Sequence, residues 1–318
     1  MATVRDLDVS SPTPRRASTP VAVVSVVAVA SAVIVAASMV LGLAEVNGIA
    51  RGPSASDETR ATFSTDVVHR LDALVAAFPG RTGVWIADRG STTPLYSHDA
   101  NTNVTTASLY KLGVLMEAER RVDSGQLRYR DMITIGEDDV TEEGSGYEVG
   151  AVLSVDDALE AMITQSDNGA ALALWHLFGG DTIDATLARA GMPDFHVTFD
   201  SAGNTVATPR AVGTFFGLLA RKELVSAAAS ERMIARLQRQ TINDRLPAAL
   251  PKQTVVAHKT GNLEGLIHDA GIIFTPRGER IVVVMTSNAY EGANDFIAEI
   301  AKIVYSASLE AAGVVHIP

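Results

Sequence analysis

The chain has 318 residues, of which 47% are hydrophobic, enough for one large or two small domains with buried cores. Its formal net charge of -11 argues against nucleic acid as a partner, because a phosphate backbone requires a basic surface. It contains no cysteine, which excludes disulfides and thiolate-bound metal sites.

The N-terminal region predicts a membrane anchor. Residues 1–20 are rich in serine, threonine, proline and arginine, and we expect a disordered cytoplasmic tail. Residues 21–43 contain no charge and no proline and are long enough to cross a bilayer as one helix. Arginines precede this segment, which predicts a single-pass protein of the cell membrane with an extracytoplasmic domain. A cleaved signal peptide is the alternative. Residues 44–62 are expected to form a linker to a domain over 63–318.

Hydrophobic spacing predicts the elements of this domain in chain order. Helices are expected over residues 65–78, from 108 onward, and over 154–165, 170–178, 182–190, 208–219, 230–240 and 293–312. Strands are expected over residues 82–88, 94–97, 253–257, 270–274 and 280–287. Because the strands cluster at the two ends of the domain around a helical middle, the order indicates an α+β fold.

Ser108 and Lys111 form an S-x-x-K pattern at the start of an apolar helix. Residues three apart on a helix share a face, so the hydroxyl and the amine can lie within hydrogen-bond reach. A buried lysine with a lowered pKa can accept the serine proton and make Ser108 a nucleophile. The pattern alone is common, and a helix-capping serine beside a solvated lysine is the alternative.

Two further polar motifs follow. The S-D-N triplet from Ser166 to Asn168 lies between two apolar helices, where polar groups are costly to bury unless each is paired. The K-T-G triplet of Lys259, Thr260 and Gly261 follows a predicted strand. Two amines beside two hydroxyls would attract a carboxylate-bearing substrate and promote proton transfer between the serines.

The ordered set S-x-x-K, S-D-N and K-T-G resembles the class A β-lactamases and penicillin-binding proteins, a superfamily of serine hydrolases. The resemblance extends from about residue 65 to the C-terminus. It implies a five-stranded antiparallel sheet flanked by helices, a separate all-helical lobe, and a site between them. We expect a monomeric catalytic domain without metal or cofactor.

The resemblance also assigns roles. Ser108 is the acylated nucleophile, and Lys111 helps to deprotonate it. Ser166, helped by Lys259, passes a proton to the leaving nitrogen. Asn168 positions the Lys111 amine and the side-chain amide of the substrate.

The third motif and the strand that carries it complete the implied site. Thr260 and Gly261 bind the substrate beside Lys259, with the Thr260 hydroxyl on its carboxylate. The backbone N–H groups of Ser108 and Leu263 are the expected oxyanion hole.

The chain departs from class A enzymes in the loop over residues 193–209. Class A enzymes carry there a glutamate that activates the water for deacylation, whereas this loop has no glutamate and is shorter. Asp200 is the candidate replacement, although its shorter side chain requires a shifted backbone. Without such a base, the acyl-enzyme should persist.

The resulting hypothesis is an extracytoplasmic serine hydrolase that opens β-lactams through a Ser108 acyl-enzyme with slow deacylation. One alternative is a D-alanyl-D-alanine carboxypeptidase or transpeptidase acting on peptidoglycan stem peptides, which the missing glutamate favours. Another is a non-catalytic sensor of β-lactams or of the cell wall.

Overall fold

The computed structural model describes residues 63–141, 144–288 and 292–310. The predicted tail, membrane anchor and linker at residues 1–62 lie outside the described residues. Within the described ranges, no helix is both long enough and apolar enough to span a membrane. Most of the expected domain over 63–318 falls inside these ranges.

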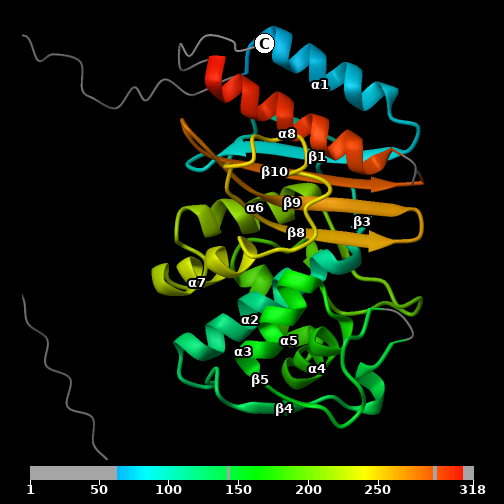
Figure 1. Ribbon diagram of the computed structural model, residues 1–318, viewed down its shortest axis with the longest axis vertical. Helices are drawn as coiled ribbons and strands as arrows, with labels where there is room; N and C mark the ends of the chain where they lie inside the picture. Colours follow the sequence, from blue (N-terminus) through cyan, green and yellow to red (C-terminus); the bar gives the residue numbers. More distant parts are fainter. Residues whose placement is uncertain (1–62, 142–143, 289–291, 311–318) are drawn as a thin grey trace, which may run out of the picture. The chain divides into compact units, whose positions relative to one another are not determined.

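A five-stranded antiparallel sheet runs through the domain (Figure 1) and confirms the predicted α+β fold. Its strands lie in the order β2-β1-β10-β9-β8, so an N-terminal and a C-terminal strand become neighbours. The strands are β1 Arg81–Asp88, β2 Tyr96–His98, β8 Val256–Leu263, β9 Leu266–Thr275 and β10 Gly278–Ser287. Gly265 and Gly278, with φ angles of 71° and 107°, supply the turn conformations between the last three strands.

Strand β8 begins at Val256, three residues later than the predicted 253–257, and runs on to Leu263, while β9 extends beyond the predicted 270–274 at both ends. The K-T-G triplet therefore lies within β8 rather than after it. Backbone pairing with the long apolar β9 carries β8 through polar residues whose side chains alone do not favour a strand.

The two faces of the sheet bury different side chains, because successive residues of a strand point to opposite sides. On β1, Val84 and Ile86 belong to an apolar cluster with helices α1 and α8. Trp85 and Ala87 belong to the cluster on the opposite face, where α6 packs against β1 and β10 (Figure 1). These helices are α1 Thr65–Ala77, α6 Pro209–Ala220 and α8 Ala293–Glu310.

Helix α6 approaches the sheet closely at Gly213. A Cβ atom at Gly213 would lie 2.2 Å from Trp85 Cδ1, so only glycine fits against the buried indole. The guanidinium of Arg210 lies 5.3 Å from the centroid of the same ring. Gly217, one turn later, is not constrained in this way, because its Cβ would meet the flexible Arg221 side chain at 3.4 Å.

The remaining helices form the predicted second lobe (Figure 1). They are the 3-10 helices η1 Ala107–Tyr110 and η2 Glu137–Asp139, the π-helix η3 Ala161–Gln165, and the α-helices α2 Lys111–Asp123, α3 Val155–Glu160, α4 Asn168–Phe178, α5 Gly180–Arg189 and α7 Ala227–Leu237. Helix α2 contacts α4, α5 and α7.

This lobe is not entirely helical, contrary to the prediction. Its connecting segments pair into two small sheets, because buried backbone groups need hydrogen-bond partners. One sheet joins β4 Met132–Thr134 to β5 Val152–Ser154, and the other joins β3 Val104–Thr105, β7 Val206–Ala207 and β6 Phe195–His196.

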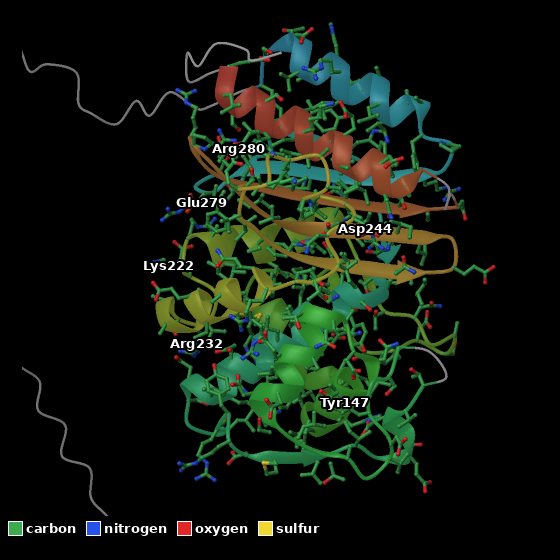
Figure 2. All side chains as sticks on the ribbon, in the orientation of Figure 1. Tyr147, Lys222, Arg232, Asp244, Glu279 and Arg280 are labelled. Carbon is green, nitrogen blue, oxygen red and sulfur yellow. The ribbon has the colours of Figure 1, made fainter. Side chains whose placement is uncertain are left out.

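A charged contact joins α7 to α2. Arg232, labelled in Figure 2, donates from Nε to Glu119 Oε2 (2.9 Å) and to the Tyr129 hydroxyl (2.7 Å). Glu119 is fully buried, and a buried carboxylate is tolerated only when it is paired. The contact therefore fixes α7 against the helix that follows Ser108.

Candidate active site

The three motifs meet where η1, α4 and β8 come together. Ser108 lies on η1, Lys111 begins α2, and β8 packs directly against η1. The Lys111 amine donates to Ser166 O (2.6 Å), Ser166 Oγ (3.3 Å) and Asn168 Oδ1 (2.7 Å). The Lys259 amine donates to the same Ser166 Oγ (2.9 Å). The Ser166 hydroxyl thus lies between two lysines that are far apart in the sequence.

The backbone holds Ser166 in an unusual conformation. The π-helical turn Ala161–Gln165 ends at Ser166, whose φ of 62° and ψ of 29° are left-handed. Asp167 then caps α4, because its Oδ1 accepts the N–H of Ala170 (2.7 Å) and its Oδ2 accepts the N–H of Gly146 (2.5 Å). Sequence reasoning gave Asp167 no separate role, although an aspartate three residues before a helical N–H is a recognisable cap signal.

Burial lowers the pKa of both lysines. Both Lys111 and Lys259 have fully buried side chains. Burial lowers the pKa of Lys111 to about 7, and the charge of Asp167 partly opposes this effect. Burial and then the charge of Lys111 hold the pKa of Lys259 well below its ordinary value, against the attraction of Asp269. An amine with a pKa near 7, as at Lys111, can act as a base near neutral pH, as the S-x-x-K hypothesis requires.

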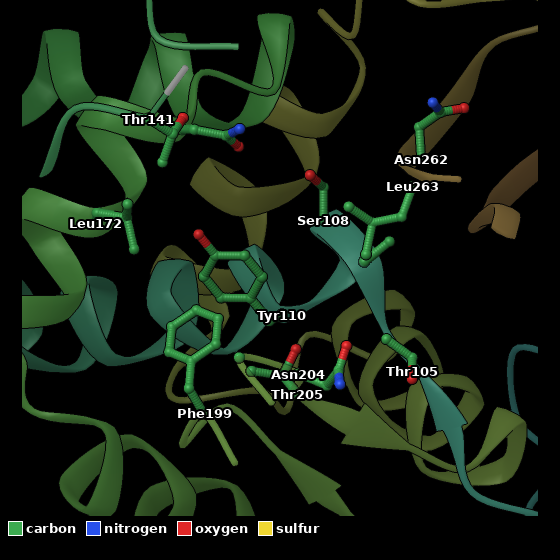
Figure 3. A pocket seen from close by; sticks show the side chains of 13 residues that line it. Thr105, Ser108, Tyr110, Thr141, Leu172, Phe199, Asn204, Thr205, Asn262 and Leu263 are labelled. Carbon is green, nitrogen blue, oxygen red and sulfur yellow. The ribbon is translucent and has the colours of Figure 1, made fainter. Parts of the chain in front are cut away.

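Ser108 lines a cleft of about 180 Å³ (Figure 3). The lining residues are Thr105, Ala107, Ser108, Tyr110, Thr141, Asn168, Leu172, Phe199, Gly203, Asn204, Thr205, Asn262 and Leu263. In the described part of the chain, the Ser108 hydroxyl forms no hydrogen bond, and the Lys111 amine is held by Ser166 and Asn168 instead. Such contacts often tighten only when substrate binds.

The backbone of β8 decides which N–H groups face this cleft. Phe274 N donates to Val255 O (3.0 Å), which makes these opposed residues a hydrogen-bonded pair. Such pairs alternate with non-hydrogen-bonded pairs along an antiparallel ladder. In this register Leu263, opposite Leu266, is hydrogen-bonded to β9, whereas the N–H of Asn262 points away from β9. The geometry therefore replaces Leu263 by Asn262 as the second oxyanion donor.

Arg245 is a site residue that sequence reasoning missed. Its Nη1 donates to Gly261 O (3.0 Å) and His268 O (2.9 Å), and its Nη2 donates to Asn262 Oδ1 (3.0 Å). The side chain is buried, so it places a fixed positive charge behind β8. It lies in an irregular segment after α7 with no local pattern, and only the tertiary fold brings it to Gly261. Thr260, also buried, lies on β8 next to Gly261, whose carbonyl Arg245 binds.

Asp200 does not reach the cleft. Its Oδ1 accepts the N–H groups of Ala202 (2.9 Å) and Asn204 (2.8 Å), so the carboxylate closes a turn within its own loop. Phe199 and Asn204, but not Asp200, line the cleft. None of the described residues that line it carries a carboxylate or an imidazole. The structure therefore gives no support to Asp200 as a deacylation base.

Comparison with known proteins identifies relatives that agree with the resemblance based on the three motifs. The sequence model of the β-lactamase enzyme family matches residues 66–308. The β-lactamase of Streptomyces fradiae is 26% identical over 261 residues, covering 75% of this chain and 85% of the relative. The β-lactamase VEB-1 of Pseudomonas aeruginosa is 26% identical over 227 residues, covering 63% of this chain and 76% of the relative.

Solved structures show the same fold. A β-lactamase from Sphaerobacter thermophilus superposes with a TM-score of 0.71 at 26% identity, covering 81% of this chain and 100% of that structure. The protein PBP-A superposes with a TM-score of 0.72 at 23% identity, covering 79% of this chain and 100% of that structure.

Proposed function

We propose that this chain, which belongs to the β-lactamase enzyme family and is a serine hydrolase, opens β-lactam amides through an acyl-enzyme at Ser108 that is hydrolysed slowly. The observation that carries the proposal is the position of the Ser166 hydroxyl between two buried amines, 3.3 Å from Lys111 Nζ and 2.9 Å from Lys259 Nζ. Ser108 lines the adjacent cleft.

Acylation follows from this arrangement. The Ser108 oxygen attacks the carbonyl carbon while its proton passes to the neutral Lys111 amine. The carbonyl oxygen becomes negative and accepts the N–H groups of Ser108 and Asn262, and losing one such donor typically costs about 3 kcal/mol of transition-state stabilisation. Ser166 then protonates the leaving nitrogen and is reprotonated through Lys111 or Lys259.

A carboxylate on the substrate is expected to bind at the β8 side of the cleft. The family resemblance assigns the carboxylate to the Thr260 hydroxyl on this strand, and Arg245 supplies a permanent charge that burial screens little from the ligand. Arg245 is held by Gly261, His268 and Asn262, so its position does not depend on the substrate. This preorganisation favours amides that carry a nearby carboxylate, as β-lactams and peptide C-termini do.

For deacylation, the described cleft residues supply no group that is placed to activate water. A water that attacks the ester needs a base, and among the described lining residues there is no carboxylate. Lys111 is the remaining candidate, and its amine is already occupied by Ser166 and Asn168. Slow release of the acyl group follows.

Because the described residues that line the cleft include no carboxylate, a second candidate function is also favoured. A peptidase or transpeptidase of the D-alanyl-D-alanine type would use the same acylation steps and pass the acyl group to an amine or to water. A sensor would be acylated in the same way but would not release the acyl group, and so would not turn over.

A chromogenic cephalosporin and a D-alanyl-D-alanine peptide separate these functions. The proposal predicts a burst of about one equivalent of product followed by slow steady turnover, and no release of D-alanine. Rapid sustained turnover would overturn slow deacylation. Release of D-alanine faster than cephalosporin turnover would favour the peptidase, and a burst with no turnover would favour the sensor.

We also propose that residues 21–43 anchor the chain in the membrane with the catalytic domain outside the cytoplasm. The support is the uncharged, proline-free segment after N-terminal arginines. Alkaline carbonate extraction of cells that produce the full chain, with protease added to spheroplasts, tests this. Full-length protein in the membrane pellet that is digested from outside agrees with an anchor. Soluble, shortened protein would indicate a cleaved signal peptide.

A further inference from the structure

A second cavity lies against the sheet, beside the catalytic cleft but outside it. It has a volume of about 480 Å³ and is formed by the ends of β1, β9 and β10 and by the segment that leads into η1. The lining residues are Arg81, Thr82, Gly83, Asp99, Thr102, Asn103, Val104, Thr105, Leu266, Met285 and Ser287. Strand β3, which contacts β10, belongs to this wall (Figure 1).

The wall of this cavity is amphipathic. Val104 and Leu266 supply a partly exposed apolar surface over the buried Met285, and hydroxyl and amide groups stand around it. Among the described residues that line it, Arg81 is the single cation, and its exposed guanidinium forms no ion pair within the described ranges. Asp99 is the single anion among these residues, and its carboxylate faces His98 at 3.8 Å. An unpaired arginine beside apolar surface suits a small molecule with an apolar body and one carboxylate.

The two cavities share one residue. Thr105 lines both and precedes Ser108 by three positions. Its carbonyl accepts a hydrogen bond from His268 Nε2 (2.8 Å), while His268 Nδ1 accepts one from Thr286 N (3.0 Å). Burial lowers the pKa of His268 to about 4, so the ring stays neutral and keeps both contacts at physiological pH.

The segment from Thr105 to Ser108 is held in a strained shape. Thr106 N donates to Thr205 O (2.8 Å), and Ala107 adopts a φ of 46° although it is not glycine. A positive φ at alanine persists only when neighbouring contacts enforce it. A ligand against Thr105 therefore acts on one end of the short segment that positions the nucleophile.

We propose that this cavity is a second ligand site for small amphipathic carboxylates, with the carboxylate on Arg81, and that its occupation changes the rate at which Ser108 is acylated. The proposed binding of carboxylates in this cavity does not depend on the proposed function. The rate effect depends on the proposed acylation of Ser108.

The binding test uses 4-phenylbutyrate and its neutral amide as matched probes on the purified domain. The protein carries ¹³C-methyl methionine, and Met285→Leu assigns the Met285 signal. The proposal predicts that the carboxylate shifts the Met285 signal with saturation and that the amide binds about tenfold more weakly, as expected for loss of one charge-assisted contact. In Arg81→Gln, the affinity for the carboxylate should fall to that for the amide. Arg277→Gln, an exposed arginine at the opposite end of β9, should change nothing.

Acylation by a chromogenic cephalosporin is then measured with and without the carboxylate. The proposal predicts a change in the acylation rate that disappears in Arg81→Gln and persists in Arg277→Gln. No shift of Met285, or a shift that survives Arg81→Gln, would overturn the site. Saturable, Arg81-dependent binding with an unchanged rate would overturn the coupling. Failure of acylation itself would count against the proposed function and leave the Met285 result intact.

Discussion

The pKa of Lys111 gives a direct test of its role as the base in acylation. Lys111 can accept the Ser108 proton only while its own amine is neutral. Burial lowers its pKa from 10.5 to about 7, which corresponds to roughly 5 kcal/mol of destabilisation of the charged form. About half of the molecules then carry a neutral Lys111 at pH 7, compared with fewer than about 0.1% at the ordinary pKa.

The acylation rate should therefore rise with pH through about 7 and level off above it. The measurement is the rate of the cephalosporin burst by stopped flow between pH 5 and pH 9. Lys111→Arg is the matched variant, because arginine keeps the positive charge and cannot lose its proton. It should slow acylation by about 10² to 10⁴, the usual contribution of a general base, and abolish the rise near pH 7.

Two results would refute this reasoning. A wild-type rate that is flat between pH 5 and pH 9 would show that no group with a pKa near 7 takes the proton. A rise near pH 7 that persists in Lys111→Arg would assign the titration to another group, with Lys259 the first to test because its pKa is also lowered.

Three further tests, two of them with a control variant, address single elements of the structure. Asn262→Pro removes an N–H that faces away from β9, and it should lower the acylation rate by about 10² to 10³, whereas Asn262→Ala should keep most of the rate. Gly213→Ala places a Cβ 2.2 Å from Trp85 Cδ1 and should destabilise the domain by about 1–3 kcal/mol in urea unfolding; Gly217→Ala should not. Asp200→Asn keeps the turn acceptor and should leave deacylation unchanged, so a large loss would restore Asp200 as the base.

Local signals were sufficient to predict much of the fold. Ser154 caps α3, since its hydroxyl accepts the N–H of Asp157 (3.1 Å). Thr208 caps α6 in the same way, since its hydroxyl accepts the N–H of Ala211 (3.1 Å). These contacts lie within three residues in the sequence, which is why the sequence pattern reveals them.

The candidate site was predictable only in part. The order of the three motifs indicated that Lys111, Ser166 and Lys259 would meet, although no local pattern could give the contacts of both amines with one hydroxyl. The choice of Asn262 over Leu263 depends on strand register, which β9 imposes on β8. Arg245 reaches β8 from an irregular segment whose course only tertiary packing determines.

The central claim is that Ser108 forms an acyl-enzyme that persists because the described residues lining the cleft include no carboxylate base. Intact mass spectrometry of the purified domain, sampled over time after addition of benzylpenicillin, tests it most directly. The structure predicts one stoichiometric adduct that decays slowly, maps to the peptide containing Ser108, and is absent from Ser108→Ala. An adduct that survives Ser108→Ala, or rapid penicillin hydrolysis with no adduct accumulating, would contradict the account.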